Sequence, residues 1–163
     1  MSFDLVEIRS SLGKIETSPK ILFDDDDGRI SDKTGINKIH RADVTAYELS
    51  VKAAKKLDCL PLIREHVRYL IYVTQSPTYL LPNHASRLQN EIGISKSAMC
   101  FDINQGCSGF VQALVLMNSL LRDSKDIGLI ICADTYSKHL SPNDRSTQVL
   151  FSDGATATVI KGG

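Results

Sequence analysis

The chain has 163 residues, of which 42% are hydrophobic and 23% are charged, and its formal net charge is zero. This length allows one ordinary domain with a real core, and this composition excludes a disordered chain. A neutral balance lacks the basic surplus typical of nucleic-acid-binding proteins, so we expect no nucleic-acid partner.

The sequence indicates neither a membrane span nor an export signal. No stretch reaches the roughly 18 consecutive apolar residues of a membrane-spanning helix, and the charged N-terminal segment lacks the pattern of a signal peptide. The four cysteines, Cys59, Cys100, Cys107 and Cys132, show no C-x-x-C spacing. We therefore expect reduced thiols in a cytoplasmic protein, with neither a disulfide framework nor a metal site.

The predicted elements alternate along the chain. In order, they are a strand at 3–12, a helix at 45–57, a turn at 62–67, a strand at 68–74, a loop at 75–82, a helix at 83–92, a strand at 99–103, a helix from 108 to 121, a strand at 127–133, a polar loop or short helix at 134–146, and a closing hairpin or last strand at 149–151 and 155–160. The acidic run Asp24 to Asp27 predicts a solvated loop, because the spacing of calcium ligands is absent.

Local signals support these elements. Thr45-x-x-Glu48 is a capping box at the start of the first helix, and Gly93 is the C-cap of the second. The runs 68–74 and 127–133 are apolar on both faces, which is typical of central strands. The alternation of strands and helices predicts an α/β fold with a mixed sheet.

The segment from Phe101 to Phe110 carries the strongest functional signal. A short apolar strand stops at the turn signal Asn104-Gln105-Gly106, Cys107 follows, and a helical pattern starts at once. Free N–H groups and the dipole at a helix N-terminus favour a thiolate, so Cys107 is a candidate nucleophile. The alternative interpretation is a buried small residue, as most cysteines are.

The helix after Cys107 is apolar around almost its whole circumference between Phe110 and Leu121. Such a helix is typical of the middle of a larger structure, so we expect Cys107 at the bottom of a pocket rather than on the surface. Gln105 occupies a position that must be small in a hydrolase nucleophile elbow, which argues against that motif.

Four segments resemble one family. The segment Gln-Gly-Cys-Ser-Gly-Phe at 105–110, after Phe-Asp-Ile-Asn, closely resembles the nucleophile motif of 3-oxoacyl-[acyl-carrier-protein] synthase III in the thiolase-like superfamily. The segments 33–36 (Lys-Thr-Gly-Ile), 143–147 (Asn-Asp-Arg-Ser-Thr) and 151–155 (Phe-Ser-Asp-Gly-Ala) resemble further family segments in matching order. The resemblance spans nearly the whole chain but only the family's first half. It implies that residues 1–163 form an N-terminal thiolase-like domain, a mixed five-stranded sheet with helices on both faces, and that the second half is absent from this chain.

The resemblance implies an acyltransferase of fatty-acid or related biosynthesis. An acyl group moves from coenzyme A to Cys107, and malonyl-acyl-carrier protein then loses carbon dioxide and attacks the thioester. The backbone N–H of Cys107 can donate to the developing oxyanion. The family's catalytic His and Asn lie in the second half, so we expect the chain alone to be inactive. We expect each of its own four histidines, His40, His66, His84 and His139, to be a surface or capping residue.

The resemblance also suggests binding residues for coenzyme A, as a substrate thioester rather than a permanent cofactor. Arg145 matches the arginine that packs on the nucleotide base, although it could instead pair with Asp144. Lys33 stands beside the cofactor in the family, and Arg29 falls near the place of a stacking Trp. This chain has no Trp, so an acyl-carrier protein or another carrier remains an alternative acyl donor. In this fold, loops after strands carry the site, so we expect 74–79 to line it.

The superfamily also implies a homodimer. Its strand before the cysteine lies at the sheet edge and pairs with its twin, which here corresponds to residues 98–103. Two other functions stay open. One is a non-catalytic thiolase-like module of a larger assembly, and the other is a Cys–His hydrolase, for which no histidine has a convincing context.

Overall fold

The computed structural model describes residues 3–23 and 28–163, so the acidic run expected to form a solvated loop lies outside the described residues. Its centre is one five-stranded sheet, made of β1 (Phe3–Leu12), β4 (Val67–Val73), β5 (Met99–Ile103), β6 (Ile127–Asp134) and β7 (Gly154–Gly162). The strand order is β1-β7-β6-β4-β5. The predicted α/β class with a mixed five-stranded sheet is confirmed.

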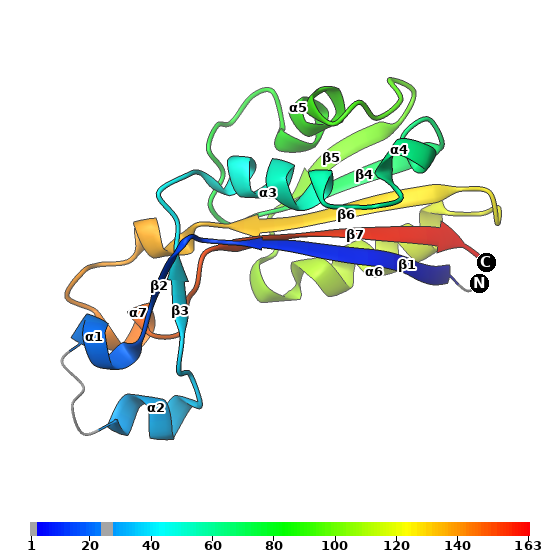
Figure 1. The fold of residues 1–163 in the computed structure, drawn as a ribbon. Helices are drawn as coiled ribbons and strands as arrows, with labels where there is room; N and C mark the ends of the chain where they lie inside the picture. The colour runs from blue at the N-terminus through cyan, green and yellow to red at the C-terminus, as the bar shows by residue number, and fades with distance from the viewer. Residues whose placement is uncertain (1–2, 24–27) are drawn as a thin grey trace.

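Helices cover both faces of the sheet (Figure 1). They are α3 (Ala46–Lys55), α4 (Leu60–Ile63) and α5 (His84–Glu91) on one face, and a 3-10 turn η1 (Gly106–Ser108) leading into α6 (Gly109–Leu120) on the other. The chain ends of the described region lie side by side at one end of the sheet. No helix among the described residues is long and apolar enough to cross a membrane.

Strand direction determines where the functional loops lie. β4 runs parallel to both β5 and β6, whereas β7 runs antiparallel to β6 and to β1. Val73, the last residue of β4, aligns with Ile103 of β5 and with Cys132 of β6. The carboxyl ends of three neighbouring strands therefore emerge at the same end of the sheet. In the part of the chain that the structure describes, β5 pairs with β4 alone and is an edge strand of the sheet, as predicted.

Two apolar clusters hold the layers together. Beneath α3 and α5, Leu49 and Leu88 are fully buried against strand residues such as Leu70. On the other face, Ala113 and Met117 of α6 pack against Ile71 and its neighbours. Burying each large aliphatic side chain stabilises the fold by about 1.5–3 kcal/mol, so these two clusters hold the helices against the two faces of the sheet.

The predicted capping box of α3 is present, whereas the C-cap of α5 is Ile92 rather than the predicted Gly93, which follows it. The Thr45 hydroxyl accepts a hydrogen bond from the Glu48 amide at 3.2 Å, and the Glu48 carboxylate accepts one from the Thr45 amide at 2.8 Å. Asn83 caps α5 through the Ser86 amide at 3.0 Å. Gly93 takes a φ of 72°, a left-handed conformation that glycine adopts without steric cost.

A small lobe beside the main sheet was not predicted. It contains β2 (Ile15–Thr17), β3 (Ile39–Arg41), α1 (Pro19–Phe23), α2 (Arg29–Thr34) and α7 (Arg145–Gln148). Its core is Phe23, Ile39 and Val149. The buried Asp153 carboxylate joins the lobe to the sheet, because it accepts hydrogen bonds from the Ala42 amide at 2.8 Å and the Ser137 hydroxyl at 2.7 Å.

Two predicted elements differ in the structure. The segment expected to be a turn at 62–67 overlaps α4, which begins at Leu60 with Pro61 in its first turn, a favoured proline position. Of the two alternatives for the end of the chain, a closing hairpin or a last strand, the structure shows a last strand, β7, and 149–151 lies outside it. Val149 is buried in the lobe core rather than paired in the sheet, which explains that difference.

Candidate active site

One carboxylate organises the loop that follows β4. Oδ1 of Asp134, the last residue of β6, accepts hydrogen bonds from the Thr74 hydroxyl at 3.0 Å and the Gln75 amide at 2.7 Å. The same oxygen accepts from the Ser76 amide at 2.9 Å and the Ser76 hydroxyl at 2.8 Å. Segment 74–76 is therefore fixed to the end of β6. It lies at the end of the sheet where the carboxyl ends of the parallel strands emerge and where the site was predicted.

The predicted nucleophile, Cys107, lies at the same end of the sheet, in the 3-10 turn η1 between β5 and α6. Gly106 before it has a φ of 55°, and a Cβ there would lie 2.8 Å from Nε2 of Gln75. Gly109 after it begins α6, where a Cβ would lie only 2.4 Å from Cγ1 of Val73. Small residues on both sides of Cys107 are thus required, because one permits the turn and the other lets α6 approach β4.

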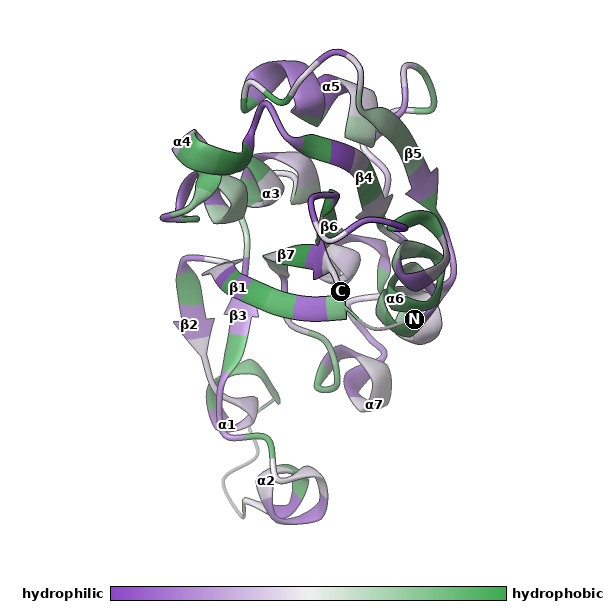
Figure 2. Ribbon diagram, turned by 90° about the vertical axis from the view of Figure 1, so that its right-hand side faces the viewer, coloured by the Kyte–Doolittle hydropathy of each residue, from purple (hydrophilic) through white to green (hydrophobic). Residues whose placement is uncertain are grey.

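The prediction that Cys107 lies at the bottom of a pocket is wrong for this chain. Cys107 is exposed, and one face of α6 is exposed with it, through Val111, Val115 and Leu116. Figure 2 shows that this helix is largely apolar. The face of α6 that bears Ala113 and Met117 packs on the sheet. Apolar side chains on the opposite face of the helix stay exposed.

The other three cysteines are free but are less accessible than Cys107. Burial, together with a hydrogen bond to Glu7, raises the pKa of Cys59 to about 11. Burial likewise raises the pKa of Cys100 to about 11 and that of Cys132 to about 11. A thiol with a raised pKa is a poor nucleophile at neutral pH, so Cys107 is the strongest candidate among the four.

The histidines divide into two groups. His66 and His139 are exposed, as predicted, and Nδ1 of His40 lies 3.1 Å from the Gly13 carbonyl oxygen. His84 is only 2% exposed, and its Nδ1 lies 2.9 Å from Oδ2 of Asp102. The prediction of an ordinary surface or capping histidine is wrong for His84. No local pattern marks this contact, because the partner of His84 lies 18 residues further along the chain.

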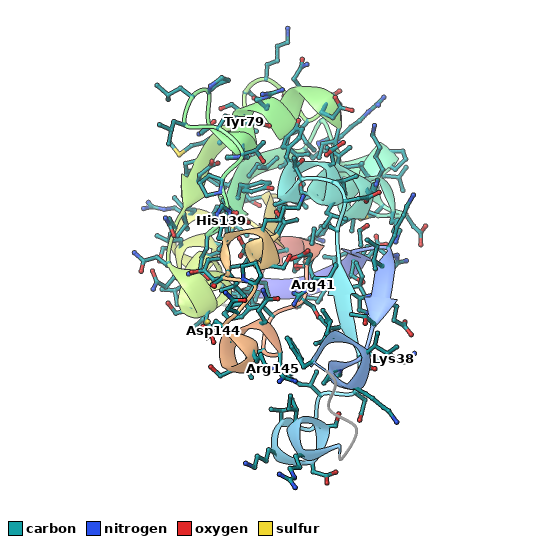
Figure 3. The ribbon with its side chains drawn as sticks, turned by 90° about the vertical axis from the view of Figure 1, so that its left-hand side faces the viewer. Lys38, Arg41, Tyr79, His139, Asp144 and Arg145 are labelled. Carbon is teal, nitrogen blue, oxygen red and sulfur yellow. The ribbon has the colours of Figure 1, made fainter. Side chains whose placement is uncertain are left out.

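The candidate coenzyme A residues all belong to the small lobe. Arg29 and Lys33 are exposed at the two ends of α2, four residues apart. Arg145 is exposed at the start of α7, and its guanidinium carbon lies 5.7 Å from the centre of the Phe23 ring. Figure 3 shows Arg145 between α7 and α1. Asp144 caps α7, because its carboxylate accepts a hydrogen bond from the Thr147 amide at 3.1 Å.

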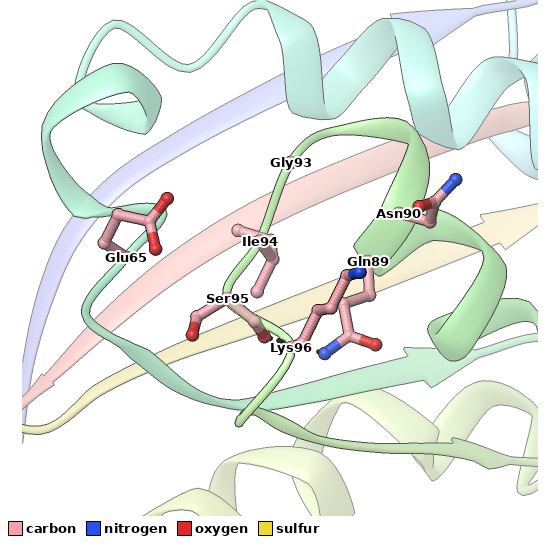
Figure 4. Close-up of a pocket in the computed structure, with 7 residues that line it drawn as sticks. All are labelled: Glu65, Gln89, Asn90, Gly93, Ile94, Ser95 and Lys96. Carbon is pink, nitrogen blue, oxygen red and sulfur yellow. Dashed lines mark hydrogen bonds between the residues drawn. The ribbon is translucent and has the colours of Figure 1, made fainter.

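Figure 4 shows a cavity of about 560 Å³ elsewhere in the domain. It is lined by Glu65, before β4, and by six residues of the segment that leads into β5, namely Gln89, Asn90, Gly93, Ile94, Ser95 and Lys96. These residues lie near the amino ends of β4 and β5, at the end of the sheet opposite to Cys107. We therefore do not assign the cavity to the active site. Within residues 3–23 and 28–163, no cluster of three or more His, Cys, Asp or Glu side chains could hold a metal ion.

The comparisons with known proteins agree with this geometry. The family described as 3-oxoacyl-[acyl-carrier-protein (ACP)] synthase III matches residues 101–163. The beta-ketoacyl-[acyl-carrier-protein] synthase III of Pasteurella multocida is 36% identical over 146 residues, which cover 86% of this chain and 45% of that protein.

Solved structures match over almost the whole chain. The 3-oxoacyl-(acyl-carrier protein) synthase of Burkholderia xenovorans has a TM-score of 0.89 at 33% identity, over 100% of this chain and 49% of the other. The 3-oxoacyl-[acyl-carrier-protein] synthase III of Aquifex aeolicus has a TM-score of 0.90 at 30% identity, over 99% and 54%. This chain therefore spans about half the length of the relatives it matches.

A parallel strand that enters a cysteine-bearing turn at the head of a helix, within this mixed sheet, defines a domain of the thiolase-like class. Sequence and fold together then identify the family. The chain belongs to the 3-oxoacyl-[acyl-carrier-protein] synthase III family.

Proposed function

We propose that this chain is the nucleophile-bearing half of an acyltransferase that condenses an acyl thioester with malonyl-acyl-carrier protein. The observation that carries the proposal is the position of Cys107. It is the exposed thiol of the four, at the head of a 12-residue helix and beside the carboxyl ends of three strands. The family membership supports the reaction class.

The chemistry assigned to Cys107 is a thioester exchange followed by a condensation. The Sγ thiolate attacks the acyl carbonyl carbon, the bond to the sulfur of coenzyme A breaks, and coenzyme A leaves as a thiolate. Malonyl-acyl-carrier protein then loses carbon dioxide, and its carbanion attacks the acyl carbonyl, which releases the Cys107 thiolate. N–H groups at the start of α6 would stabilise both the thiolate and the oxyanion.

The small lobe is the proposed coenzyme A surface. Arg29, Lys33 and Arg145 place three positive charges on α2 and α7, two short helices of the lobe whose core is Phe23, Ile39 and Val149. Guanidinium and ammonium groups suit phosphates, and a planar guanidinium also suits a base. The proposed acyl donor is therefore a coenzyme A thioester, and acyl-carrier protein is the proposed partner for the malonyl group.

A mass measurement tests the nucleophile. The protein is incubated with acetyl-coenzyme A and, separately, with longer acyl-coenzyme A donors, and its intact mass is then recorded. We expect one acyl adduct, mapped by peptide digestion to Cys107, which is lost in Cys107→Ala and kept in the matched variant Cys132→Ala. No adduct from any donor would favour a non-catalytic module.

A second segment is needed for turnover in this proposal. Val111 and Val115 on α6 are 60% and 62% exposed, as expected of a helix whose outer face is covered by further protein in the complete enzyme. His84 is held by Asp102 and is not free to act as a base. We therefore expect the 163-residue chain alone to form no condensation product from acetyl-coenzyme A and malonyl-acyl-carrier protein. Robust formation of the condensed 3-oxoacyl product, measured by mass spectrometry of the acyl-carrier protein, would contradict this expectation.

A further inference from the structure

A buried histidine and a half-buried aspartate connect loop 74–79 with the end of β5, the strand that leads to Cys107. Oδ2 of Asp102, on β5, lies 2.9 Å from Nδ1 of His84 and accepts a hydrogen bond from the His84 amide at 2.8 Å. Oδ1 of the same carboxylate accepts from the Ala85 amide at 2.9 Å. Asp102 thus satisfies donors in the first turn of α5 and binds the imidazole of His84 at the same time.

The second nitrogen of the ring has a different partner. Nε2 of His84 accepts a hydrogen bond from the amide of Thr78 at 3.0 Å. A backbone amide can only donate, so Nε2 carries no proton and the proton of the neutral ring lies on Nδ1, facing Asp102. The two contacts therefore select one tautomer.

Aromatic stacking fixes the plane of the ring. His84 is stacked between Tyr72 of β4, at a centroid distance of 5.0 Å, and Tyr79 of the following loop, at 4.5 Å. The guanidinium of Arg87 covers the outer side of Tyr79 at 4.1 Å from the ring centre. The ring has no room to turn, so it holds Thr78 and Asp102 at fixed positions relative to each other.

Both hydrogen bonds of the ring lead to the turn that carries Cys107. Asp102 lies on β5, five residues before Cys107 in the chain. Thr78 belongs to the loop whose Gln75 side chain lies against Gly106. A change at His84 would therefore loosen two supports of one turn, one through the strand and one through the loop.

We propose that His84 is a positioning residue, which together with Asp102 keeps loop 74–79 and the end of β5 in the register that orders the Cys107 turn. The proposal rests on the proposed function in one respect, that Cys107 is the nucleophile. Ordered N–H groups stabilise a thiolate only while the turn is held in place, so loss of the imidazole should slow the reaction of Cys107 with an electrophile.

The test uses His84→Phe, which keeps a ring between the two tyrosines but removes both ring hydrogen bonds. The matched control is Asn83→Ala, which removes the neighbouring α5 cap but leaves the contact between His84 and Thr78. In His84→Phe we expect the Thr78 amide to lose its protection from hydrogen exchange. We also expect iodoacetamide to alkylate Cys107 about two- to fivefold more slowly at neutral pH, the size of a helix-terminus effect. The control should show neither change.

The wild-type chain provides a second test if His84→Phe does not fold. Nitrogen NMR shifts of His84 should show the neutral tautomer protonated on Nδ1. A ring protonated on Nε2 at neutral pH would overturn the proposal, as would an unchanged Cys107 rate in a folded His84→Phe protein. Even labelling of the four cysteines in the wild-type chain would instead contradict the proposed function, so the two failures are distinguishable.

Discussion

At the residue scale, the four thiols lie in environments that differ enough to be measured. Cys59, Cys100 and Cys132 each have a pKa raised to about 11, with burial as the largest cause. Cys107 is exposed at the head of α6. We predict that iodoacetamide at neutral pH alkylates Cys107 faster than the others by more than about tenfold, measured by peptide mass spectrometry over time. Similar rates at all four positions would contradict its assignment as the nucleophile.

Gly109 offers a second residue-scale prediction. Replacing it by Ala places a Cβ at 2.4 Å from Cγ1 of Val73, so α6 must move away from β4. We expect Gly109→Ala to lower the free energy of unfolding in urea by about 1–3 kcal/mol, the usual cost of overpacking. In a Val73→Ala background the same change should cost less, because the opposing methyl group is gone. An equal loss of unfolding free energy in both backgrounds would show that the contact between residues 109 and 73 does not determine how closely α6 packs on β4.

At the element scale, the junction of β5 with α5 predicts how stability depends on pH. Burial alone would raise the pKa of Asp102, but hydrogen bonds from His84 and from the amides of His84 and Ala85 outweigh burial, and the pKa is lowered. A carboxyl whose folded pKa is depressed stabilises the fold above its unfolded pKa of about 3.9, and this contribution is lost as the pH falls through the folded value.

Asp102→Asn tests that linkage. We expect it to lower the free energy of unfolding at neutral pH by about 1.5–3 kcal/mol, the range for hydrogen bonds to a charged group. The difference from the wild-type protein should shrink as the pH falls below about 4. Asp4→Asn, at an exposed position of β1, should follow the wild-type curve. A difference that stays constant with pH would contradict the role of the Asp102 charge.

The elements also show what the sequence could predict. Long elements with caps or continuous apolar runs, such as α3 with its capping box and β4, were predicted because their signals are local. β2, β3 and α7 have three or four residues each and are held by contacts between distant segments, so no periodicity marks them.

The candidate site was also predicted only where its signals are local. The turn signal before Cys107 located the nucleophile corner, but not the contacts that hold it. Asp134 reaches back about 60 residues to Thr74 and Ser76, and His84 reaches forward to Asp102. The exposure of α6 was mispredicted for another reason. An apolar circumference shows that a helix can be buried on all sides, but what covers it depends on further protein rather than on its own sequence.

At the scale of the whole molecule, the edge strand β5 presents a surface for association. Among the described residues, β5 pairs only with β4, and its sequence Met-Cys-Phe-Asp-Ile contains neither Lys nor Pro, the residues that commonly prevent pairing at sheet edges. Met99 at its start is 58% exposed. A strand of this kind exposes N–H and C=O groups, and the same strand of a second copy, related by a two-fold axis, can satisfy them.

We therefore propose a homodimer through residues 98–103, with the two Cys107 turns near the interface. Phe101→Lys should shift the dimer toward monomer in sedimentation velocity at micromolar concentration, because it places a charge on the paired strand. Phe101 is also partly packed under α6, so Met99→Lys, at a more exposed position of the same strand, serves as a second variant. The control is Leu62→Lys on α4, where the side chain is already 79% exposed and lies away from β5. A wild-type chain that sediments as a monomer at this concentration would refute the proposed interface, whereas equal dissociation by all three lysine variants would indicate association through another surface.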